Sequence, residues 1–470
     1  MRRALLLLVL ALMALSAAPG ASAAAPDPRG LRPLGIGHVF VINVENKSFN
    51  EAYVTNKNPY LSKTLRSQGV LLRQYFGTGH LSLGNYIAQL SGQAPNAATQ
   101  SDCQIYQDQQ PGLAALAGQS VGQGCVYPAR VQTLPDQLTA AGLTWRGYME
   151  DMGNDLSREP DRCGEPTNPT GAGMRDGTQS ATATDQYAAR HNPFVYFHSI
   201  LDSPRCHQQV LPLTALSNDL ARSSTTANFT YITPNLCNDG HDDPCVGKNV
   251  RGTKAGGLTA VDFWLQKYVP LITSSPAFKQ DGVLVIAADE SENNDTSACC
   301  NEPPGLNTPL PGITGPGGGR IGALVLGRCV KPGSSSDVPY NHYSLLRSFE
   351  DLFGIRQGGS DGAGHLGYAG AAGLVPFGRD VFASSCGAAA AAPASVRERP
   401  AAPPSRTGGG PPPAAGGPPP ESGGPLPASG GPLPATSGAL AATGGLPLGL
   451  TAAALTGTAL LVRRRLRKAS

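Results

Sequence analysis

Four short runs of apolar residues stand out along the chain because they lack the polar alternation of a half-exposed strand. β-Branched residues are frequent in these runs. Such runs predict strands that are buried on both faces of a sheet. The four runs are His38–Val44, Asn228–Thr233, Gly282–Ala288 and Ile321–Gly327.

Helical patterns lie between these runs. Pro135 stands at the start of one segment and Gly142 ends it, as is typical of helix boundaries. The stretch His342–Phe353 has leucine and phenylalanine at helical spacing, and Gly354 follows as a stop. This alternation of buried strands and helices predicts an α/β domain with a mostly parallel sheet covered by helices on both faces.

The amino terminus has the composition of an export signal. Two arginines precede the apolar run Ala4–Ala17, and the small residues Ala21–Ala23 follow it. This order predicts a cleaved signal peptide over residues 1–24. A retained membrane anchor is the alternative, although the apolar run is short for a span. Either reading predicts that the domain is exported.

All ten cysteines lie between Cys103 and Cys386. In an exported chain an even number of cysteines favours disulfides over zinc ligation. Cys237 and Cys245 flank a short polar loop and are the first candidate pair. We expect the adjacent residues Cys299 and Cys300 to bond two different partners rather than each other. The spacing leaves the remaining connectivity open.

The composition changes after residue 386. Residues 387–439 are rich in alanine, proline and glycine, which predicts an extended, disordered stalk. Residues 440–470 contain the motif LAATG, a hydrophobic segment at 446–462 and a basic tail. This order resembles a cell-wall sorting signal, which implies a sortase-type transpeptidase and peptidoglycan as partners. A plain membrane anchor is the alternative, since 446–462 is marginally long enough to span a bilayer.

The net charge narrows the class of ligand. The chain has 36 basic and 33 acidic residues, a net charge of +3, and part of the excess lies in the basic tail. The predicted domain at 35–386 is therefore near neutral, which argues against nucleic acid as a partner.

Polar patches follow the predicted strands or open the predicted helices, where ligands gather in parallel α/β sheets. Glu45 and Asn46 follow the first strand and offer oxygen ligands for a divalent cation, or form a turn. Ser82 stands at a helix start, where backbone N–H groups favour a phosphate. It is a candidate nucleophile, with Asn85 as a donor to a phosphoryl oxygen, or an ordinary helix cap.

Two further patches are acidic. Asn238–Asp243 holds three aspartates and His241, a dense set of ligand types for metal or phosphate, or a solvated loop. Asp289 and Glu290 end an apolar strand, where two carboxylates are costly unless a cation neutralises them. His342 opens the last predicted helix, as a ligand, a proton donor or a surface residue.

The order of these patches is more specific than any one of them. The series ENKSF, HLSLGNYIAQLSG, TPNLCNDGHDD, VLVIAADES and HYSLLRSFEDLFG, with RHNPF at 190–194, resembles the bacterial phosphoesterase family. That family holds secreted acid phosphatases and phospholipase C-type enzymes of the alkaline phosphatase superfamily. The likeness runs from about His38 to about Gly354. It implies a three-layer α/β/α, alkaline-phosphatase-like domain.

The resemblance also implies roles for individual residues. Ser82 matches the nucleophile that forms a phosphoseryl intermediate, with His342 and Asn85 as further catalytic residues. A divalent metal ion is the implied cofactor, and His80, His191 and Asn85 are the implied substrate-binding residues. The implied metal ligands are Glu45, Asn46, Ser82, Asp239, His241, Asp289 and Glu290.

The sequence departs from the family pattern in four places. Leu81 and Gly84 replace two prolines around Ser82, and Ala288 replaces a large residue before Asp289. Asp243 replaces a glycine. The segment Ser291–Pro303 is longer than the glycine-rich loop expected there. These departures leave the choice of substrate open.

The sequence as a whole predicts an extracellular, metal-dependent hydrolase of phosphate monoesters, anchored to the cell wall or tethered to the membrane at its outer face. The expected substrate is a phosphorylated small molecule or a lipid head group. The alternatives are a phospholipase C-like phosphodiesterase and a catalytically degenerate surface binding module. The metal ligands retained in the motifs favour an enzyme over a binding module.

Overall fold

The computed structural model describes residues 34–167, 174–292, 294–308, 310–312 and 316–383. The predicted signal peptide at 1–24, the stalk at 387–439 and the sorting signal at 440–470 lie outside these residues. Within the described residues, no helix is both long and apolar enough to cross a membrane.

An eight-stranded sheet forms the centre of the domain, with the strand order β13-β2-β12-β11-β1-β10-β7-β9. All neighbouring strands pair in parallel except those beside β12, which runs against both of its neighbours. The strands are β1 (His38–Val44), β2 (Val70–Leu72), β7 (Trp145–Met149), β9 (Val210–Pro212), β10 (Phe229–Thr233), β11 (Gly282–Ala288), β12 (Ala323–Gly327) and β13 (Ser334–Ser336).

Short two-stranded sheets flank the central one. They are β3 (Tyr75–Phe76) with β14 (Tyr340–Asn341), β4 (Ile105–Tyr106) with β8 (Met174–Arg175), and β5 (Gln110–Ala114) with β6 (Ser120–Gln123). The α-helices are α2 (Phe49–Tyr53), α3 (Ser82–Ser91), α4 (Leu134–Ala140), α5 (His198–Leu201), α6 (Arg205–Gln209), α7 (Leu216–Asp219), α8 (Gly257–Ser274), α9 (Pro276–Asp281) and α10 (His342–Leu352).

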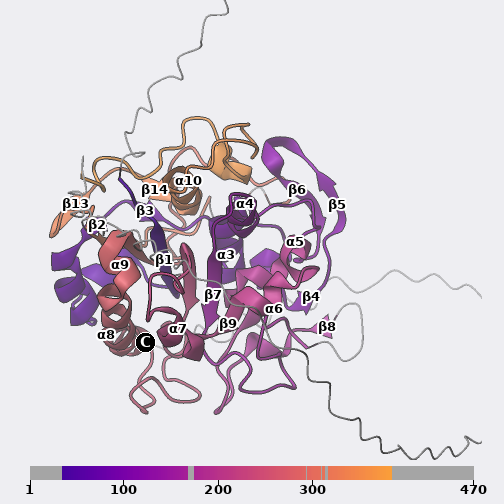
Figure 1. The fold of residues 1–470 in the computed structure, drawn as a ribbon. Coiled ribbons are helices and arrows are strands. Elements are labelled where there is room, and N and C mark those ends of the chain that lie inside the picture. Colours follow the sequence, from indigo (N-terminus) through magenta and orange to yellow (C-terminus); the bar gives the residue numbers. More distant parts are fainter. Residues whose placement is uncertain (1–33, 168–173, 293, 309, 313–315, 384–470) are drawn as a thin grey trace, which may run out of the picture. The chain divides into compact units, whose positions relative to one another are not determined.

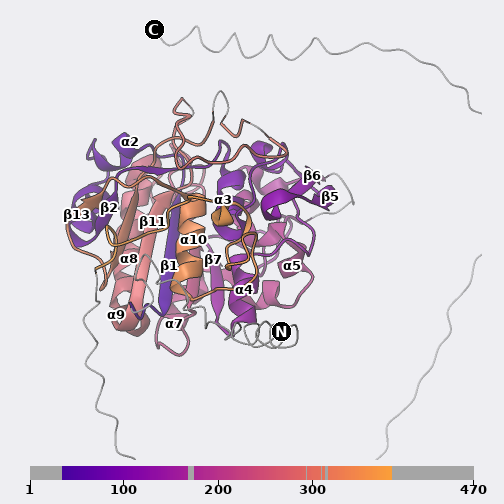
Figure 2. The same ribbon diagram turned by 90° about the horizontal axis from the view of Figure 1, so that it is seen from above.

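The predicted α/β class is confirmed. Helices α8 and α9 cover one face of the sheet, and α3, α4 and α10 lie on the other (Figures 1 and 2). Every residue of β1, β10 and β11 is buried, which explains why these strands are apolar without alternation. The fourth predicted strand, β12, is also present and is the antiparallel member of the sheet.

Capping residues fix the ends of the helices. Thr133 and Asp136 form a reciprocal capping box at the start of α4, and the Asn341 side chain accepts the Ser344 N–H at the start of α10. Such caps satisfy backbone donors that a helix leaves unpaired. Helix α10 therefore starts at His342, as the sequence predicted.

The register of the sheet brings three acidic residues together. β1 lies between β10 and β11, and all three strands point the same way. The backbone N–H of Glu45 donates to the Asp239 carbonyl at 2.8 Å, and that of Asp289 donates to the Val44 carbonyl at 3.0 Å. The carboxyl ends of these strands thus deliver Glu45, Asp239 and Asp289 to one edge, where parallel sheets hold ligands.

The described residues contain four disulfides, and one corrects a prediction. Cys237–Cys245 is the predicted pair and is confirmed. Cys299 and Cys300 bond each other rather than two different partners. The six earlier cysteines pair among themselves, and Cys300 lies in a turn with a φ of 67°. The other two bonds are Cys103–Cys125 and Cys163–Cys206.

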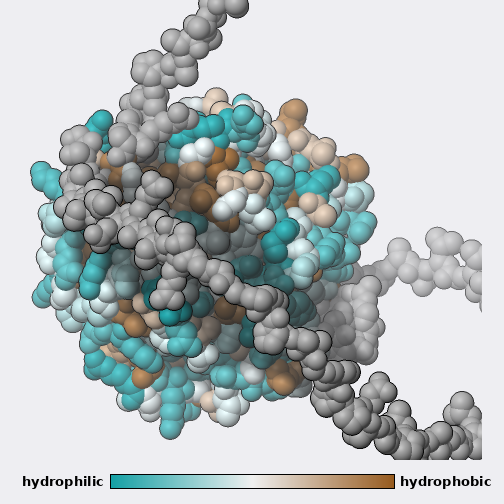
Figure 3. Space-filling model, in the orientation of Figure 1, coloured by the Kyte–Doolittle hydropathy of each residue, from teal (hydrophilic) through white to brown (hydrophobic). Residues whose placement is uncertain are grey.

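The surface is mixed rather than uniformly polar. In Figure 3, hydrophilic residues surround smaller hydrophobic areas, one of which lies where Figure 1 draws α10. The large hydrophobic side chains that are most exposed among the described residues include Leu116, Leu156 and Leu310. They lie far apart in the sequence, so the surface alone does not indicate the functional site.

Candidate active site

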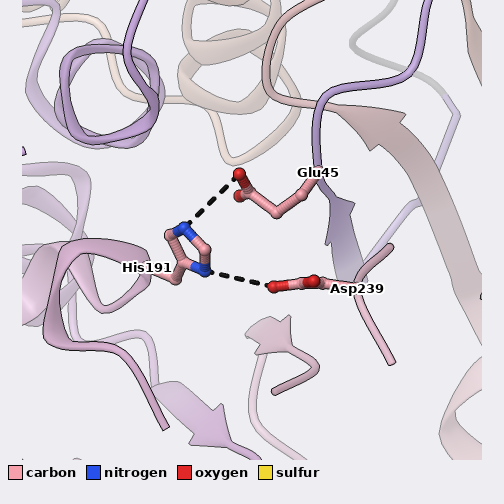
Figure 4. A group of neighbouring side chains, drawn as sticks. All are labelled: Glu45, His191 and Asp239. Atoms are coloured by element: carbon pink, nitrogen blue, oxygen red, sulfur yellow. Dashed lines mark ion pairs between the residues drawn. The ribbon is translucent and has the colours of Figure 1, made fainter. Parts of the chain in front are cut away.

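Glu45, His191 and Asp239 form a compact group of potential metal ligands (Figure 4). His191 ends the short helix η6 (Ala189–His191) and lies between the two carboxylates. Its Nε2 is 3.4 Å from Glu45 Oε2, and its Nδ1 is 3.2 Å from Asp239 Oδ2. One ligand atom from each residue lies within 4.8 Å of the others, and all three residues are buried.

Several polar atoms in this group have no hydrogen-bond partner among the described residues. They are both ring nitrogens of His191, Oδ2 of Asp239 and Oδ2 of the neighbouring Asp289. Buried polar atoms without partners are rare because desolvation is not compensated. A nitrogen and several carboxylate oxygens around one point suit a divalent cation. The donor set therefore fits the metal ion that the sequence implied.

Burial dominates the electrostatics of these residues. It raises the pKa of Glu45 well above its ordinary value, and the charges of Asp289 and Asp239 raise it further. Burial likewise raises the pKa of Asp239. Burial lowers the pKa of His191 well below its usual range, and the Arg190 cation adds to that. A bound cation would reverse the first two shifts, since it favours the ionised carboxylates.

Ser82 lies directly beside this group, at the first position of α3. Its hydroxyl donates to Glu45 Oε2 at 2.7 Å, and the Tyr86 hydroxyl donates to Glu45 Oε1. The Tyr86 ring also stacks on His191, with ring centroids 5.3 Å apart and planes 8° apart. Tyr86 therefore orients two members of the group, a role that the sequence analysis missed although the residue lies in its second motif.

The turn before Ser82 is strained. Leu81 has a φ of 35° and gives α3 no side-chain cap, and positive φ is costly for a residue with a branched side chain. The cap comes from elsewhere in the chain, because Asp102 Oδ1 accepts the Leu83 N–H at 3.0 Å. The sequence analysis proposed that the free N–H groups at this helix start bind a phosphate. One of them, the Leu83 N–H, is instead bonded to Asp102.

A hollow of about 250 Å³ opens beside Ser82. Its wall carries a lysine, several acidic side chains and the hydroxyl of the candidate nucleophile. The lining residues are Asn46, Lys47, Leu81, Ser82, Asp102, His241, Glu290, Ser291 and Glu292. Four of the predicted site residues therefore line one space, and Lys47 and Asp102 are lining residues that the sequence analysis did not select.

His80 and Glu290 pair with each other. His80 Nδ1 contacts Glu290 Oε2, and His80 Nε2 lies 3.0 Å from the Asp295 carbonyl. Burial disfavours the imidazolium, but the hydrogen bond and charge of Glu290 raise the pKa of His80 overall. Burial raises the pKa of Glu290 to about 8, although the hydrogen bond from His80 lowers it. Both ring nitrogens of His80 are thus engaged by the protein itself.

Asn85 is also engaged within the protein. Its Oδ1 accepts from the backbone N–H groups of Thr78 and Gly79 at 2.9 and 3.0 Å. Its Nδ2 donates to the Gly79 carbonyl at 2.9 Å. These contacts hold the loop that precedes Ser82, so Asn85 in this geometry supports the nucleophile turn.

His342 lies behind Asp289 rather than in the lining of the hollow. Its Nε2 is 2.6 Å from the Asp289 carbonyl, and its Nδ1 is 3.0 Å from the Tyr75 hydroxyl. The carbonyl requires a donor, so Nε2 carries the proton and Nδ1 accepts. Burial lowers the pKa of His342 to about 4. The neutral ring therefore fixes the strand end that carries Asp289.

The two remaining predicted ligands lie at the rim. The Asn46 backbone N–H donates to Asp289 Oδ1 at 3.0 Å, and its φ is 50°. His241 Nε2 lies 3.2 Å from an Arg190 nitrogen and its Nδ1 lies 2.8 Å from Asp242 Oδ1. Because arginine only donates, His241 accepts at Nε2. His191 lies between the carboxylates of Glu45 and Asp239, and its assignment to substrate stays a prediction.

Curated relatives share most of the described region. The chain is 23% identical over 315 residues to a phosphate-repressible acid phosphatase from Penicillium chrysogenum. It is 22% identical over 319 residues to an acid phosphatase from Aspergillus fumigatus. These alignments cover 66% and 67% of this chain but only 58% and 54% of the relatives. The chain thus spans somewhat more than half the length of these fungal relatives.

A bacterial relative is covered more fully. The chain is 21% identical over 328 residues to a phosphatidylinositol-3-phosphatase from Mycobacterium tuberculosis, covering 68% of this chain and 78% of that one. Among solved structures, a protein in the alkaline phosphatase superfamily from Vibrio parahaemolyticus gives a TM-score of 0.37 at 14% identity. That match covers 68% of this chain and 66% of the other. At this TM-score the structural likeness supports no conclusion.

The family model is decisive where the structural likeness is weak. The model of the Phosphoesterase family matches residues 51–356, which is more than half of the chain. The match includes Ser82, His191, Asp239 and Asp289, and it begins just after Glu45. It confirms the resemblance that the ordered motifs indicated. The chain belongs to the Phosphoesterase family.

Proposed function

We propose that this protein hydrolyses phosphate monoesters through a phosphoseryl intermediate on Ser82, with the help of a divalent metal ion. The observation that carries the proposal is the Ser82 hydroxyl, which lines the hollow and donates to Glu45 beside the group formed with His191 and Asp239. The acid phosphatases among the relatives support the same reaction class.

Glu45 serves as the proton acceptor for the nucleophile. As Ser82 Oγ attacks phosphorus, its proton passes to Glu45 Oε2, which already accepts it at 2.7 Å. The bond from phosphorus to the alcohol oxygen breaks as the bond to Ser82 Oγ forms, and the departing alkoxide takes a proton from water. Water then attacks the phosphoserine, releasing phosphate and restoring the hydroxyl.

Glu45, His191 and Asp239 would hold the metal ion, and Asp289 lies close enough in the structure to raise the pKa of Glu45. The ion would neutralise the buried carboxylates and stabilise negative charge on the transferred phosphoryl group. Tyr86 keeps Glu45 and His191 oriented, and the turn at Leu81 presents Ser82 to the hollow. The residues that would bind the metal ion and orient Ser82 are therefore already held in position by the fold.

The size of the hollow favours monoesters of modest size. Its volume of about 250 Å³ is below the ~300–1,000 Å³ of pockets that bury drug-sized ligands. A phosphoryl group with one small alcohol or a lipid head group at the mouth fits such a space.

The place of action is outside the cell membrane in this proposal. The disulfides among the described residues support an oxidising compartment. Attachment through a sortase-type transpeptidase to peptidoglycan, or through a membrane segment, concerns residues 440–470 and stays a prediction from sequence.

The test is hydrolysis of p-nitrophenyl phosphate and bis-p-nitrophenyl phosphate by the full chain, with and without a chelator. We expect the monoester to be preferred, activity to vanish with the chelator, and Ser82→Ala to lose about 10³-fold or more in kcat. Ser91→Ala is the matched control, because Ser91 lies at the other end of α3 and donates to the Ile87 carbonyl. Acid quenching should trap phosphate on the peptide that carries Ser82.

Two outcomes would overturn the proposal. Full activity of Ser82→Ala would remove the nucleophile from the mechanism. Failure of metal-supplemented wild type to hydrolyse either ester would favour the reading of a degenerate binding module.

A further inference from the structure

The hollow beside Ser82 needs a positive group if it is to hold a phosphate. Its lining includes three acidic residues, Asp102, Glu290 and Glu292. Such a wall repels an anionic ester unless cations offset it. Lys47 is the lysine that lines this space among the described residues, and no role follows for it from the mechanism above.

Lys47 is held in place although its charge is only partly satisfied. It is 8% exposed, and its Nζ donates to the Asn46 carbonyl at 3.0 Å. An ammonium has three donors. Among the described residues, Lys47 forms an ion pair with Glu292, whose Oε1 lies 3.8 Å from its Nζ. That separation is beyond hydrogen-bond distance. A nearly buried cation with an incomplete partner is costly unless a ligand completes it.

The path of the lysine stem is built into the fold. Gly240 has a φ of 99°, and a Cβ built there would lie 3.2 Å from Lys47 Cε and 2.8 Å from Val261 Cγ2. The glycine of the motif NDGHDD therefore leaves room for the stem of Lys47 as it passes the carboxyl end of β10. Because its stem is confined in this way, Lys47 holds its ammonium group at a fixed position beside the hollow.

Glu292 differs from Lys47 in its surroundings. Its side chain is 55% exposed, against 10% for the side chain of Lys47. It lies in the segment Ser291–Pro303, which is longer than the family pattern. An exposed ion pair at this distance contributes little, so an anion that enters the hollow can replace Glu292 at low cost.

We infer that Lys47 binds the phosphoryl group of the substrate, and that Glu292 is the counter-ion that this group displaces. The inference rests on the proposed function and adds the residue that recognises the anion. Lysine acts on phosphate as a point charge. Lys47 therefore attracts a dianionic monoester more strongly than a monoanionic diester.

The test uses inorganic phosphate as the probe, with the full chain supplied with a divalent metal. Calorimetry gives the Kd of phosphate, and inhibition of p-nitrophenyl phosphate hydrolysis gives its inhibition constant. We expect Lys47→Met to weaken both about tenfold to a hundredfold, as loss of a hydrogen bond to a charged group does. Lys47→Arg should restore part of the affinity, since the charge returns.

Glu292→Gln should act in the opposite direction. Removing the displaced counter-ion should tighten phosphate binding by about twofold to fivefold, as loss of a weak exposed ion pair predicts. If Lys47 and Glu292 had only structural roles, their variants would not change the affinity for phosphate in opposite directions. Lys63→Met is the control, because Lys63 is exposed on η1 (Tyr60–Leu65) and does not line the hollow.

Ester selectivity gives a second readout. The ratio of kcat/KM for p-nitrophenyl phosphate to that for bis-p-nitrophenyl phosphate should fall in Lys47→Met, mainly through KM for the monoester. A phosphate Kd within twofold of wild type in Lys47→Met would overturn the inference. If wild type binds phosphate through Lys47 but hydrolyses neither ester, the proposed function fails while phosphate recognition by Lys47 stands.

Discussion

Two groups of residues around Ser82 have similar chemistry but different hydrogen bonding. The open triad is Glu45, His191 and Asp239, where both ring nitrogens of His191 and one oxygen of Asp239 lack a hydrogen-bond partner among the described residues. The bonded shell is the second group. It consists of His80, Asn85, Glu290 and His342, all of which bond protein atoms.

The difference separates residues that can bind a ligand from residues that hold the site in shape. A buried histidine that contacts carboxylates without forming an aligned hydrogen bond, as His191 does, is stabilised by an added partner. A buried histidine whose two ring nitrogens both bond protein groups, such as His80 or His342, needs no further partner and orients the groups that it bonds. Residues of both kinds occur in the family motifs, so hydrogen bonding distinguishes them where residue type does not.

His191→Ala should have the largest effect of the variants that probe this comparison. Removal of a ligand from the open triad should lower both divalent-cation affinity and kcat/KM by about 100-fold or more, since even residues that only support ligands cost 10–100-fold. Metal content after dialysis and the steady-state kinetics measure the two effects. His198→Ala is the control, because His198 is partly exposed and pairs with Asp108 and Asp202.

Asn85→Ala should mainly reduce stability. It leaves buried N–H groups of Thr78 and Gly79 without their acceptor, which should lower the free energy of unfolding by about 3 kcal/mol. Denaturant unfolding measures the loss, and kcat should fall by less than about tenfold at temperatures where the fold persists. A 100-fold loss of kcat with unchanged stability would instead assign Asn85 to the phosphoryl group.

His342→Gln should change how stability depends on pH. The pKa of His342 falls from 6.5 to about 4 in the fold because of burial, so the unfolded chain binds more protons between these values. The contribution of His342 to stability is therefore present above about pH 6.5 and is lost as the pH falls toward 4. Glutamine does not titrate, so the difference in Tm between wild type and variant should shrink as the pH falls. A constant difference would mean that the ring is not held neutral.

Replacement of Cys299 and Cys300 by serine should have the smallest effect. A bond between adjacent residues closes almost no loop, so its loss should cost only about 1 kcal/mol, against about 4 kcal/mol for Cys163–Cys206 with its separation of 43 residues. The His80 contact with Asp295 lies earlier in the same loop and should persist. Thermal unfolding of the Cys299/Cys300 and Cys163/Cys206 double serine variants measures the two losses of stability. A larger loss for the Cys299/Cys300 variant would contradict the prediction.

The fold was predictable where burial of both strand faces gives an uninterrupted apolar run in the sequence. β1 and β11 match their predicted bounds because both faces of each strand are buried. Strand β7 contains Arg146 and Gly147, which interrupt the apolar run, and β13 is a run of three serines at the sheet edge. Such strands form because their neighbours pair with them, and a single sequence does not carry that information.

The sequence placed several residues of the candidate site in its motifs but did not show which atoms they contact. The ordered motifs located Glu45, Asp239 and Asp289, which the sheet register brings to one edge. They also located Ser82, which donates to Glu45 from the start of α3. Roles depend on pairs far apart in the sequence, such as His80 with Glu290 and His342 with the carbonyl of Asp289. Local spacing does not show which atoms such pairs engage, so it did not show that His191 lies between two carboxylates or that Lys47 lines the hollow.

The central claim is that the open triad holds a divalent cation beside Ser82. The most direct measurement is crystallography of the full chain soaked in Mn²⁺, with anomalous scattering used to locate the ion. The account predicts an anomalous peak about 2.0–2.3 Å from ligand atoms of Glu45, His191 and Asp239, the usual range for such bonds. A peak bound only by residues outside the triad, or full occupancy of the same position in His191→Ala, would contradict it.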